Sequence, residues 1–154
     1  MGAKTIHLAA ESRTRNVAAS IAGRVKGGER ICLYGPLGSG KTTFVRGFLR
    51  ALGVRGPVRS PTFELIHEYR RIKPRAYHMD FYRLKPRDIE NLGLQEYLED
   101  ASAVCLIEWP EAAEGRLGPD RLELTLEHEL RSRGRLLQAR AFGPASSNLL
   151  RGLL

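Results

Sequence analysis

The sequence predicts a single α/β domain over residues 1–154, with a mixed central sheet, flanking helices and a late β-hairpin. Three observations predict this class. Strand and helix patterns alternate early in the chain, a glycine-rich loop joins one strand to one helix, and two alternating strands follow near the end. The composition, 42% hydrophobic and 27% charged, is that of an ordinary globular protein.

The first strand and helix are predicted from the spacing of apolar residues. Residues 4–8 alternate between polar and apolar side chains and predict a short strand. Ser12 is of a type that caps helices, and apolar residues then recur at helical spacing up to Val25. Gly27 and Gly28 are expected to end this helix.

The second strand and helix flank the glycine-rich loop. Residues 30–34 form a compact apolar run that predicts a strand, and Gly-Pro-Leu-Gly-Ser-Gly-Lys-Thr follows at residues 35–42. Beyond the loop, apolar residues between Phe44 and Leu52 lie on one side of a predicted helix that ends at Gly53.

The middle of the chain predicts three more strands and one interrupted helix. Residues 62–69 and 77–82 have strand character and are joined by a basic turn. Residues 86–99 are predicted to be helical, with a break at Gly93. Residues 103–107 are continuously apolar, which is typical of a strand covered on both faces of a sheet.

The last part of the chain predicts the hairpin. Apolar residues alternate with polar ones over residues 122–127 and again over residues 137–141, with a turn around Gly134 between them. A short amphipathic helix is expected within residues 146–154.

The charge and cysteine content limit the possible function classes. Lys and Arg number 25 against 17 Asp and Glu, a net charge of +8, which favours anionic partners such as nucleotide or RNA but also serves solubility. Cys32 and Cys105 lie inside apolar runs and are expected to be buried thiols, not a disulfide or a metal site. No apolar run reaches the roughly 20 residues of a membrane-spanning helix, so we expect a cytoplasmic protein without membrane contact.

Residues 35–42 match the Walker A pattern, Gly-x-x-x-x-Gly-Lys-Thr, between a predicted strand and a predicted helix. The glycines let successive N–H groups point at phosphate oxygens, and the start of the next helix adds its positive dipole end. Lys41 is expected to reach the β- and γ-phosphates, and the Thr42 hydroxyl to bind Mg²⁺. The nucleotide-binding residues expected in this loop are Gly35, Leu37, Gly38, Ser39, Gly40, Lys41 and Thr42.

A second anchor for Mg²⁺ is usually a carboxylate at the end of an apolar strand. Glu108 follows the apolar run of residues 103–107 and is the expected metal ligand beside Thr42. Asp80 ends a shorter, more polar strand and is expected to act at the γ-phosphate, directly or through a water. Either acid could instead be a surface carboxylate at a strand end. His78, two residues before Asp80, could hydrogen-bond near the site, but no functional role is expected for it.

The nucleotide is expected to be ATP. A guanine-specific GTPase usually carries an Asn-Lys-x-Asp base-reading motif and an Asp-x-x-Gly switch, and neither occurs in the sequence.

Four blocks in order carry a family resemblance: residues 33–44 around the Walker A loop, Ser-Pro-Thr-Phe at 60–63, Tyr-His-Met-Asp-Phe-Tyr-Arg-Leu at 77–84, and Leu-Ile-Glu-Trp-Pro-Glu at 106–111. The sequence resembles the bacterial TsaE (YjeE) family, small ATPases needed for threonylcarbamoyladenosine in tRNA. The resemblance runs from the first helix to about Gly143. It implies a P-loop NTPase domain with weak intrinsic, Mg²⁺-dependent ATP hydrolysis.

The resemblance also implies partners and residue roles. The family works with TsaB and TsaD and resets that pair between turnovers, whereas TsaD transfers the threonylcarbamoyl group to tRNA. A monomer that enters a hetero-complex is implied, with tRNA met through that complex, and direct contact of this chain with tRNA is left open. Thr42 and Glu108 would hold Mg²⁺, and Lys41, Asp80 and the switch residue Thr62 would serve hydrolysis. The further nucleotide contacts implied are Thr43, Trp109, Glu11, Ser12, Arg133 and Arg135.

Two other functions share the same loop. A small-molecule or nucleotide kinase needs an acceptor pocket and an arginine-bearing lid, for which residues 70–75 or the late arginines are candidates. A nucleotide-gated binding module would use ATP binding alone to order the loop at Thr62.

Overall fold

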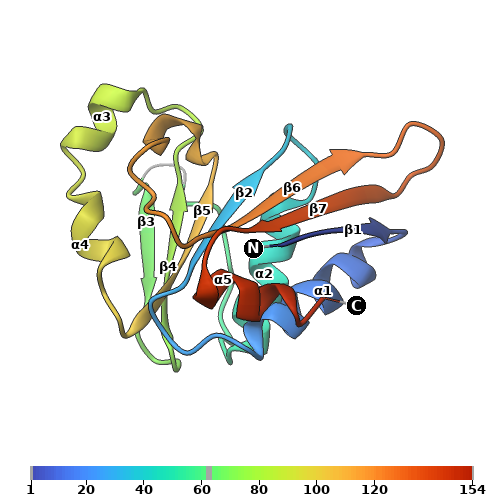
Figure 1. Cartoon of the computed structure of the whole chain (residues 1–154), viewed down its shortest axis with the longest axis horizontal. Helices are drawn as coiled ribbons and strands as arrows, with labels where there is room; N and C mark the ends of the chain where they lie inside the picture. Colours follow the sequence, from blue (N-terminus) through green and yellow to red (C-terminus); the bar gives the residue numbers. More distant parts are fainter. Residues whose placement is uncertain (1, 62–63, 154) are drawn as a thin grey trace.

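One mixed sheet of seven strands forms the centre of the computed structural model, which describes residues 2–61 and 64–153 (Figure 1). The strand order is β1-β7-β6-β2-β5-β4-β3. Strands β6, β2, β5 and β4 are parallel, and the pairs β1/β7, β6/β7 and β3/β4 are antiparallel. The strand bounds are β1 (Gly2–Leu8), β2 (Arg30–Tyr34), β3 (Ile66–Tyr69), β4 (Arg75–Asp80), β5 (Ala103–Glu108), β6 (Leu122–His128) and β7 (Arg135–Ala141). The predicted α/β class, mixed sheet and late hairpin are confirmed.

Helices cover both faces of this sheet. Their bounds are α1 (Glu11–Ala22), α2 (Lys41–Ala51), α3 (Pro86–Glu90), α4 (Leu94–Leu98), the 3₁₀ helix η1 (Pro110–Ala113) and α5 (Pro144–Leu150). The first apolar cluster joins α1, α2 and α5 to one face, and the second joins α3, α4 and η1 to the other. No helix among the described residues is long and apolar enough to cross a membrane.

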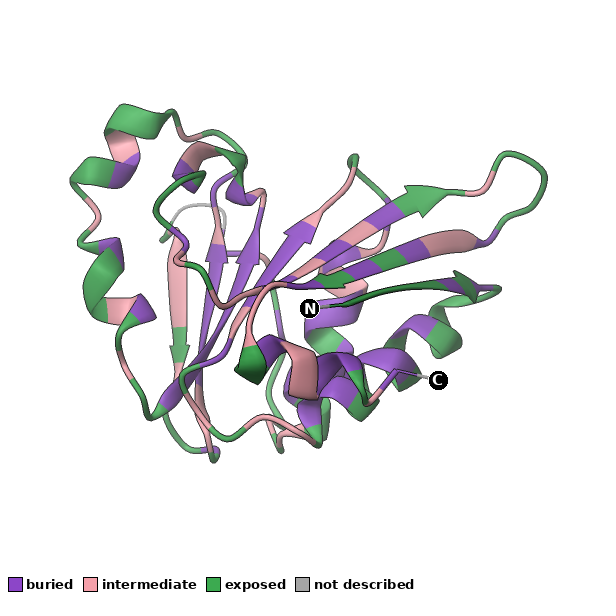
Figure 2. Cartoon of the chain, in the orientation of Figure 1, coloured by how far each residue is buried: buried purple, intermediate pink, exposed green. Residues whose placement is uncertain are grey.

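The central strands contribute to both clusters because side chains alternate along a strand. Ile31 and Leu33 pack in the first cluster, whereas Cys32 between them packs in the second. Every residue of β5 is buried, as expected for a strand covered on both faces (Figure 2). Cys32 and Cys105 are free, buried thiols, and burial raises the pKa of each to about 12.

The structure corrects several expectations in the first half of the chain. Helix α1 ends at Ala22 with Gly23 as its C-cap, so it stops before Gly27 and Gly28, which were expected to end it. The N-cap of α1 is Ala10, not Ser12, because the chain is already helical at Glu11, and no side chain caps this helix. Strand β3 begins at Ile66 rather than residue 62. Leu65 has a positive φ of 65°, which interrupts the extended conformation before β3, and residues 62 and 63 lie outside the described residues.

Other bounds also differ from expectation, including the start of β4 at Arg75 rather than residue 77, and one expected break is present. Strand β4 ends at Asp80 rather than residue 82, because Tyr82 N–H donates to Asp80 Oδ1 and turns the chain. Helix α5 begins at Pro144 and ends at Leu150, earlier than predicted. Gly93, with φ 65°, separates α3 from α4 as expected.

The two ends of the described chain pack together through α5. Lys4 Nζ donates to Leu153 O at 2.7 Å, and Arg24 Nε donates to Asn148 O at 2.7 Å. Leu149, Leu150 and Leu153 are buried in the first cluster. The terminal elements therefore complete the core on the face that α1 and α2 cover.

Candidate functional site

The site lies where the parallel strands β2, β4 and β5 end. Residues 35–40 leave β2 and lead into α2, and Asp80 at the end of β4 lies opposite Glu108 at the end of β5. In an open α/β sheet, ligands bind at this carboxyl edge of the strands. A cavity of about 730 Å³ opens there, within the range of small-molecule and cofactor sites.

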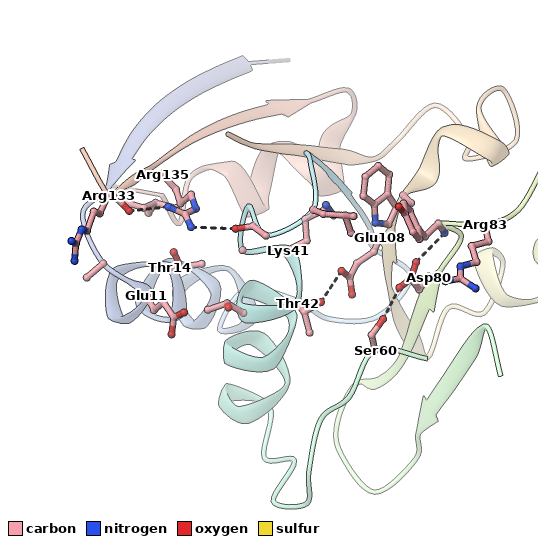
Figure 3. Close-up of a pocket in the computed structure, with 18 of the residues that line it drawn as sticks. Glu11, Thr14, Lys41, Thr42, Ser60, Asp80, Arg83, Glu108, Arg133 and Arg135 are labelled. Carbon is pink, nitrogen blue, oxygen red and sulfur yellow. Dashed lines mark hydrogen bonds between the residues drawn. The ribbon is translucent and has the colours of Figure 1, made fainter. Parts of the chain in front are cut away.

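The cavity brings together five parts of the chain (Figure 3). They are the end of β1 with the start of α1, the Walker A loop with α2, Ser60 and Leu65 from the segment between α2 and β3, the ends of β4 and β5, and the β6–β7 turn. The lining residues are Leu8, Ala10, Glu11, Thr14, Leu37, Gly38, Gly40, Lys41, Thr42, Thr43, Ser60, Leu65, Asp80, Tyr82, Arg83, Glu108, Trp109, Arg133 and Arg135.

The Walker A loop needs glycine where its backbone turns. Gly35 has φ 140°, and a Cβ there would lie 2.2 Å from Leu126 O. Gly40, with φ 106°, is the N-cap of α2, so the first N–H groups of that helix stay free of a side-chain cap. Free N–H groups at a helix start are suited to bind phosphate.

Lys41 is folded back onto its own loop. Its Nζ donates to Gly35 O and, at 3.0 Å, to Pro36 O, and it lies 4.1 Å from the centroid of the Trp109 ring. Burial lowers the pKa of Lys41, and the nearby Glu108 carboxylate opposes this shift. The Lys41 ammonium group is therefore bound to carbonyl oxygens of the Walker A loop, and Lys41 lines the cavity.

Glu108 is held at both carboxylate oxygens. Thr42 Oγ1 donates to Glu108 Oε1 at 3.0 Å, and His78 Nε2 lies 2.6 Å from Glu108 Oε2. Glu108 is 2% exposed and His78 is fully buried. The hydrogen bond from Thr42 to Glu108 thus joins the first turn of α2 directly to the end of β5.

Asp80 is paired with Glu108 in the register of β4 and β5, but its carboxylate has different hydrogen-bond partners. Its Oδ2 accepts from the Ser60 hydroxyl at 2.5 Å, and its Oδ1 accepts from Tyr82 N–H at 3.0 Å. The residue is half-buried and lines the cavity. These two donors orient the carboxylate without burying it.

Trp109 has a left-handed backbone that is rare for a bulky residue. Its φ and ψ are 54° and 56°, directly before Pro110 and η1. Its ring lies 4.7 Å from that of Tyr82, centroid to centroid. Backbone strain of this kind tends to occur at functional sites, where the surroundings hold the residue in place.

The start of α1 and the hairpin turn form one side of the cavity (Figure 3). Glu11, Arg133 and Arg135 line it, and Arg135 Nη2 donates to Gly38 O at 3.2 Å. Ser12 is exposed and is not among the lining residues.

Three further predicted residues do not form the described lining. Gly35 and Ser39 belong to the Walker A loop but do not line the cavity. The buried Ser39 hydroxyl has no hydrogen-bond partner in the described part of the chain. Thr62 lies outside the described residues.

Sequence patterns did not identify several lining residues. Ser60 and Arg83 lie inside blocks of the family resemblance, and that was the one signal available for them. Leu8 and Thr14 belong to no recognised motif. Leu8 lines the cavity because β1 pairs with β7, and Thr14 lines it because α1 packs in the same cluster as α2, which follows the Walker A loop.

The oxygen donors fit Mg²⁺. Thr42 offers a hydroxyl, and Glu108 and Asp80 offer carboxylates, all of them hard oxygen ligands. Within residues 2–61 and 64–153, no three His, Cys, Asp or Glu side chains form a cluster that could hold a metal ion. NTPase sites commonly bind Mg²⁺ through few protein oxygens together with the phosphates of the nucleotide, and these residues suit that arrangement.

A Walker A loop between a parallel strand and a helix, facing carboxylates at the ends of neighbouring strands, defines a P-loop NTPase fold. A family model described as "Threonylcarbamoyl adenosine biosynthesis protein TsaE" matches residues 8–136. The chain belongs to the TsaE family, which takes part in tRNA threonylcarbamoyladenosine biosynthesis. The resemblance in the sequence is confirmed.

Relatives and a solved structure agree with this assignment. The chain is 41% identical over 114 residues to the "tRNA threonylcarbamoyladenosine biosynthesis protein TsaE" of Bacillus subtilis, covering 74% of this chain and 71% of the relative. The protein of the same name from Haemophilus influenzae is 43% identical over 88 residues, 56% of this chain and 55% of the relative. The crystal structure of Bacillus subtilis YdiB superposes with a TM-score of 0.84 and 31% identity, covering 97% of this chain and 93% of that one.

Proposed function

We propose that the protein is a Mg²⁺-dependent ATPase of low intrinsic activity that acts with TsaB and TsaD in threonylcarbamoyladenosine modification of tRNA. In this role it resets the TsaB–TsaD pair between turnovers and does not transfer the threonylcarbamoyl group. One observation supports the ATPase above all others. The Walker A hydroxyl of Thr42 hydrogen-bonds to Glu108, and Asp80 is paired with Glu108 in the strand register.

Phosphate binding is assigned to the Walker A loop. Five residues of this loop and of the first turn of α2 line the cavity: Leu37, Gly38, Gly40, Lys41 and Thr43. Gly35 and Ser39 lie in the same loop and allow its backbone to turn. Lys41 exchanges its bonds to the Gly35 and Pro36 carbonyls for phosphate oxygens.

Metal binding is assigned to Thr42 and Glu108. Bound Mg²⁺ neutralises charge that develops on the phosphates. Thr42 and Glu108 already share a hydrogen bond at 3.0 Å, so they meet at one point of the cavity.

Hydrolysis is assigned to Asp80 with Lys41, and Thr62 is proposed as the residue that senses the γ-phosphate. The Asp80 carboxylate is half-exposed and oriented by Ser60 and Tyr82, so it can accept a hydrogen bond from an attacking water. Lys41 stabilises the negative charge on the phosphoryl group.

The rest of the nucleotide is assigned to the cavity wall made by Trp109, Glu11, Arg133 and Arg135. The Trp109 ring offers a flat surface for stacking, and the two arginines supply positive charge beside the loop. Ser12, exposed on the first turn of α1, is an outer contact in this proposal.

The setting of the reaction is proposed from family membership. The protein is a cytoplasmic monomer when alone, meets TsaB and TsaD in a complex, and approaches tRNA through them. The net charge of +8 is compatible with such anionic surroundings.

The test is phosphate release from Mg·ATP with and without the cognate TsaB and TsaD proteins. We expect slow release alone and strong stimulation by the pair. Lys41→Ala should abolish both, whereas the exposed Lys73→Ala, outside the cavity, should abolish neither. Phosphate that appears on a small acceptor without stimulation by the pair would establish the kinase alternative. ATP binding without any release would establish the nucleotide-gated module.

A further inference from the structure

His78 lies beside the proposed metal site but has no role in the proposal above. It is on β4, two residues before Asp80, so the two side chains point to the same face of the sheet. Asp80 is paired with Glu108 in the register, and His78 is paired with Leu106 of the same face. The imidazole is fully buried.

Among the described residues, the His78 side chain has one hydrogen-bond partner, the carboxylate of Glu108. Nε2 lies 2.6 Å from Glu108 Oε2, while Glu108 Oε1 accepts from Thr42 at 3.0 Å. The side chains are 0% and 3% exposed. A carboxylate held at both oxygens by groups on two different elements has little freedom to rotate.

The position of the imidazole hydrogen follows from burial. His78 Nδ1 is buried and has no hydrogen-bond partner in the described part of the chain. A hydrogen on Nδ1 would be a buried donor without an acceptor, which is costly, so the hydrogen belongs on Nε2. His78 therefore donates to Glu108 Oε2.

This donation has a consequence for Thr42. Glu108 Oε1 is turned toward α2 because Oε2 is occupied by His78. Thr42 has one hydroxyl hydrogen and donates it to Oε1, which leaves the lone pairs of its oxygen free for a cation. The chain of contacts from His78 through Glu108 to Thr42 thus orients the two proposed ligands.

We propose that His78 is a positioning residue that sets the affinity of the site for a divalent cation bound together with a nucleoside phosphate. The inference rests on the proposed function, because the cation is the Mg²⁺ of that proposal. Hydrogen-bond partners of metal ligands typically change metal affinity by about 10–100-fold when they are removed.

His67 supplies a matched control. It is the residue of β3 paired with His78 in the antiparallel register, so both histidines lie on the same face. His67 is half-buried and pairs with Glu64 at 3.1 Å instead of Glu108. Removing its imidazole tests the loss of a neighbouring histidine without touching the proposed ligands.

The experiment measures Mn²⁺ binding in the presence of ADP by electron paramagnetic resonance, and ADP binding in EDTA by calorimetry. In His78→Leu we expect Mn²⁺ affinity to fall by about 10–100-fold, with ADP affinity in EDTA within about twofold of wild type. His78→Gln carries an amide N–H near the position of Nε2 and should recover most of the Mn²⁺ affinity. His67→Leu should match wild type in both measurements.

Each outcome decides the inference. Wild-type Mn²⁺ affinity in His78→Leu overturns it, and so does an equal loss of ADP affinity in EDTA, which would indicate a purely structural role. If His78→Leu does not fold, His78→Asn and His78→Gln replace it, because the Asn amide does not reach the position of Nε2. Equal Mn²⁺ affinity in those two variants overturns the inference. Wild type that binds ADP with no contribution from Mn²⁺ instead overturns the proposed metal site.

Discussion

Asp80 and Glu108 are neighbours in the register of two parallel strands, yet their carboxylates have different environments. Glu108 is buried between Thr42 and His78, whereas Asp80 is half-exposed between Ser60 and Tyr82. A buried carboxylate with fixed donors suits a ligand role, and an accessible one suits proton or water chemistry. The environment therefore separates two roles that the residue type alone does not.

This separation predicts the behaviour of Asp80→Asn. The amide keeps the size of the side chain but loses its basicity, so ATP affinity should stay within a few-fold of wild type. Partner-stimulated hydrolysis should fall by about 10²–10⁴-fold, the usual contribution of a positioned acid or base. Phosphate release and calorimetric ATP binding measure the two effects.

Asp88→Asn is the matched control, because Asp88 binds the start of α3 and does not line the cavity. Wild-type turnover in Asp80→Asn would remove this residue from the mechanism. A variant without hydrolysis that still supports repeated cycles of tRNA modification would contradict the resetting role.

Asp100 predicts a pH effect far from the site. Hydrogen bonds from Ser102 and Tyr77 hold the pKa of Asp100 at about 2. The unfolded value is about 3.9. Because the folded pKa is lower, this contribution to stability is present above pH 4 and is lost as the pH falls toward 2. Urea unfolding between pH 5 and pH 2 should show a shallower decline in Asp100→Asn than in wild type, whereas Glu99→Gln, at an exposed neighbour, should follow wild type.

At the residue scale, the sequence was informative where chemistry demands particular residue types at fixed spacing. The Walker A motif and the predicted strand ends identified four candidate site residues, which are Lys41, Thr42, Asp80 and Glu108. The contact of His78 with Glu108 could not, because it depends on the register between β4 and β5.

At the scale of elements, α1 and α2 pack unusually closely at Gly47. A Cβ at this position would lie 2.8 Å from Arg15 Cα and 3.1 Å from Arg15 Cβ. The absence of a side chain thus sets how near the helix that follows the Walker A loop can lie to its neighbour. Apolar spacing predicted both helices, but only the packed structure explains why this glycine stands inside one of them.

Gly47→Val should therefore destabilise the protein by about 1–3 kcal/mol through overpacking. Chemical denaturation measures the change in the free energy of unfolding. Ala51→Val is the control, because Ala51 is exposed on the same helix and the change adds a valine side chain where it faces solvent instead of α1. An equal loss in the two variants would show that packing against α1 is not the cause.

Element bounds were least predictable where a side-chain hydrogen bond, local or distant in sequence, begins or ends a segment. Strand β4 stops at Asp80 because its carboxylate binds Tyr82 N–H. Helix α5 begins early because Asp120, 25 residues away in sequence, accepts from Ala145 N–H at 2.8 Å. Neither contact is visible in local periodicity.

At the scale of the whole molecule, the class of fold could be predicted but the strand order could not. Alternation shows which face of a strand is buried, not which strand lies beside it. The pairing of β1 with β7 joins Gly2 to Ala141, across almost the entire chain, and it brings Leu8 to the cavity. The family model begins only at residue 8 and ends at 136, so most of β1 and all of α5 lie outside the matched region.

Removal of residues 144–154 should therefore affect stability more than the site. Leu149, Leu150 and Leu153 would leave the first cluster, and each buried leucine contributes about 1.5–3 kcal/mol. We expect a clearly lower melting temperature, with the ADP affinity of the folded fraction close to wild type. Arg151→Ala, at an exposed position of the same segment, should melt like wild type. An unchanged melting temperature after truncation would contradict the proposed role of α5 in the core.

Trp109 is the one tryptophan in the sequence, and the Lys41 ammonium lies 4.1 Å from its ring centroid. All indole fluorescence of the protein thus originates beside the loop lysine, without background from elsewhere. A cation over the ring alters the energy of the excited state, so the emission should change when Lys41 moves to a phosphate. Lys41→Ala should remove most of that change. The protein therefore carries its own optical reporter of loop occupancy, which can be followed in stopped flow without a label.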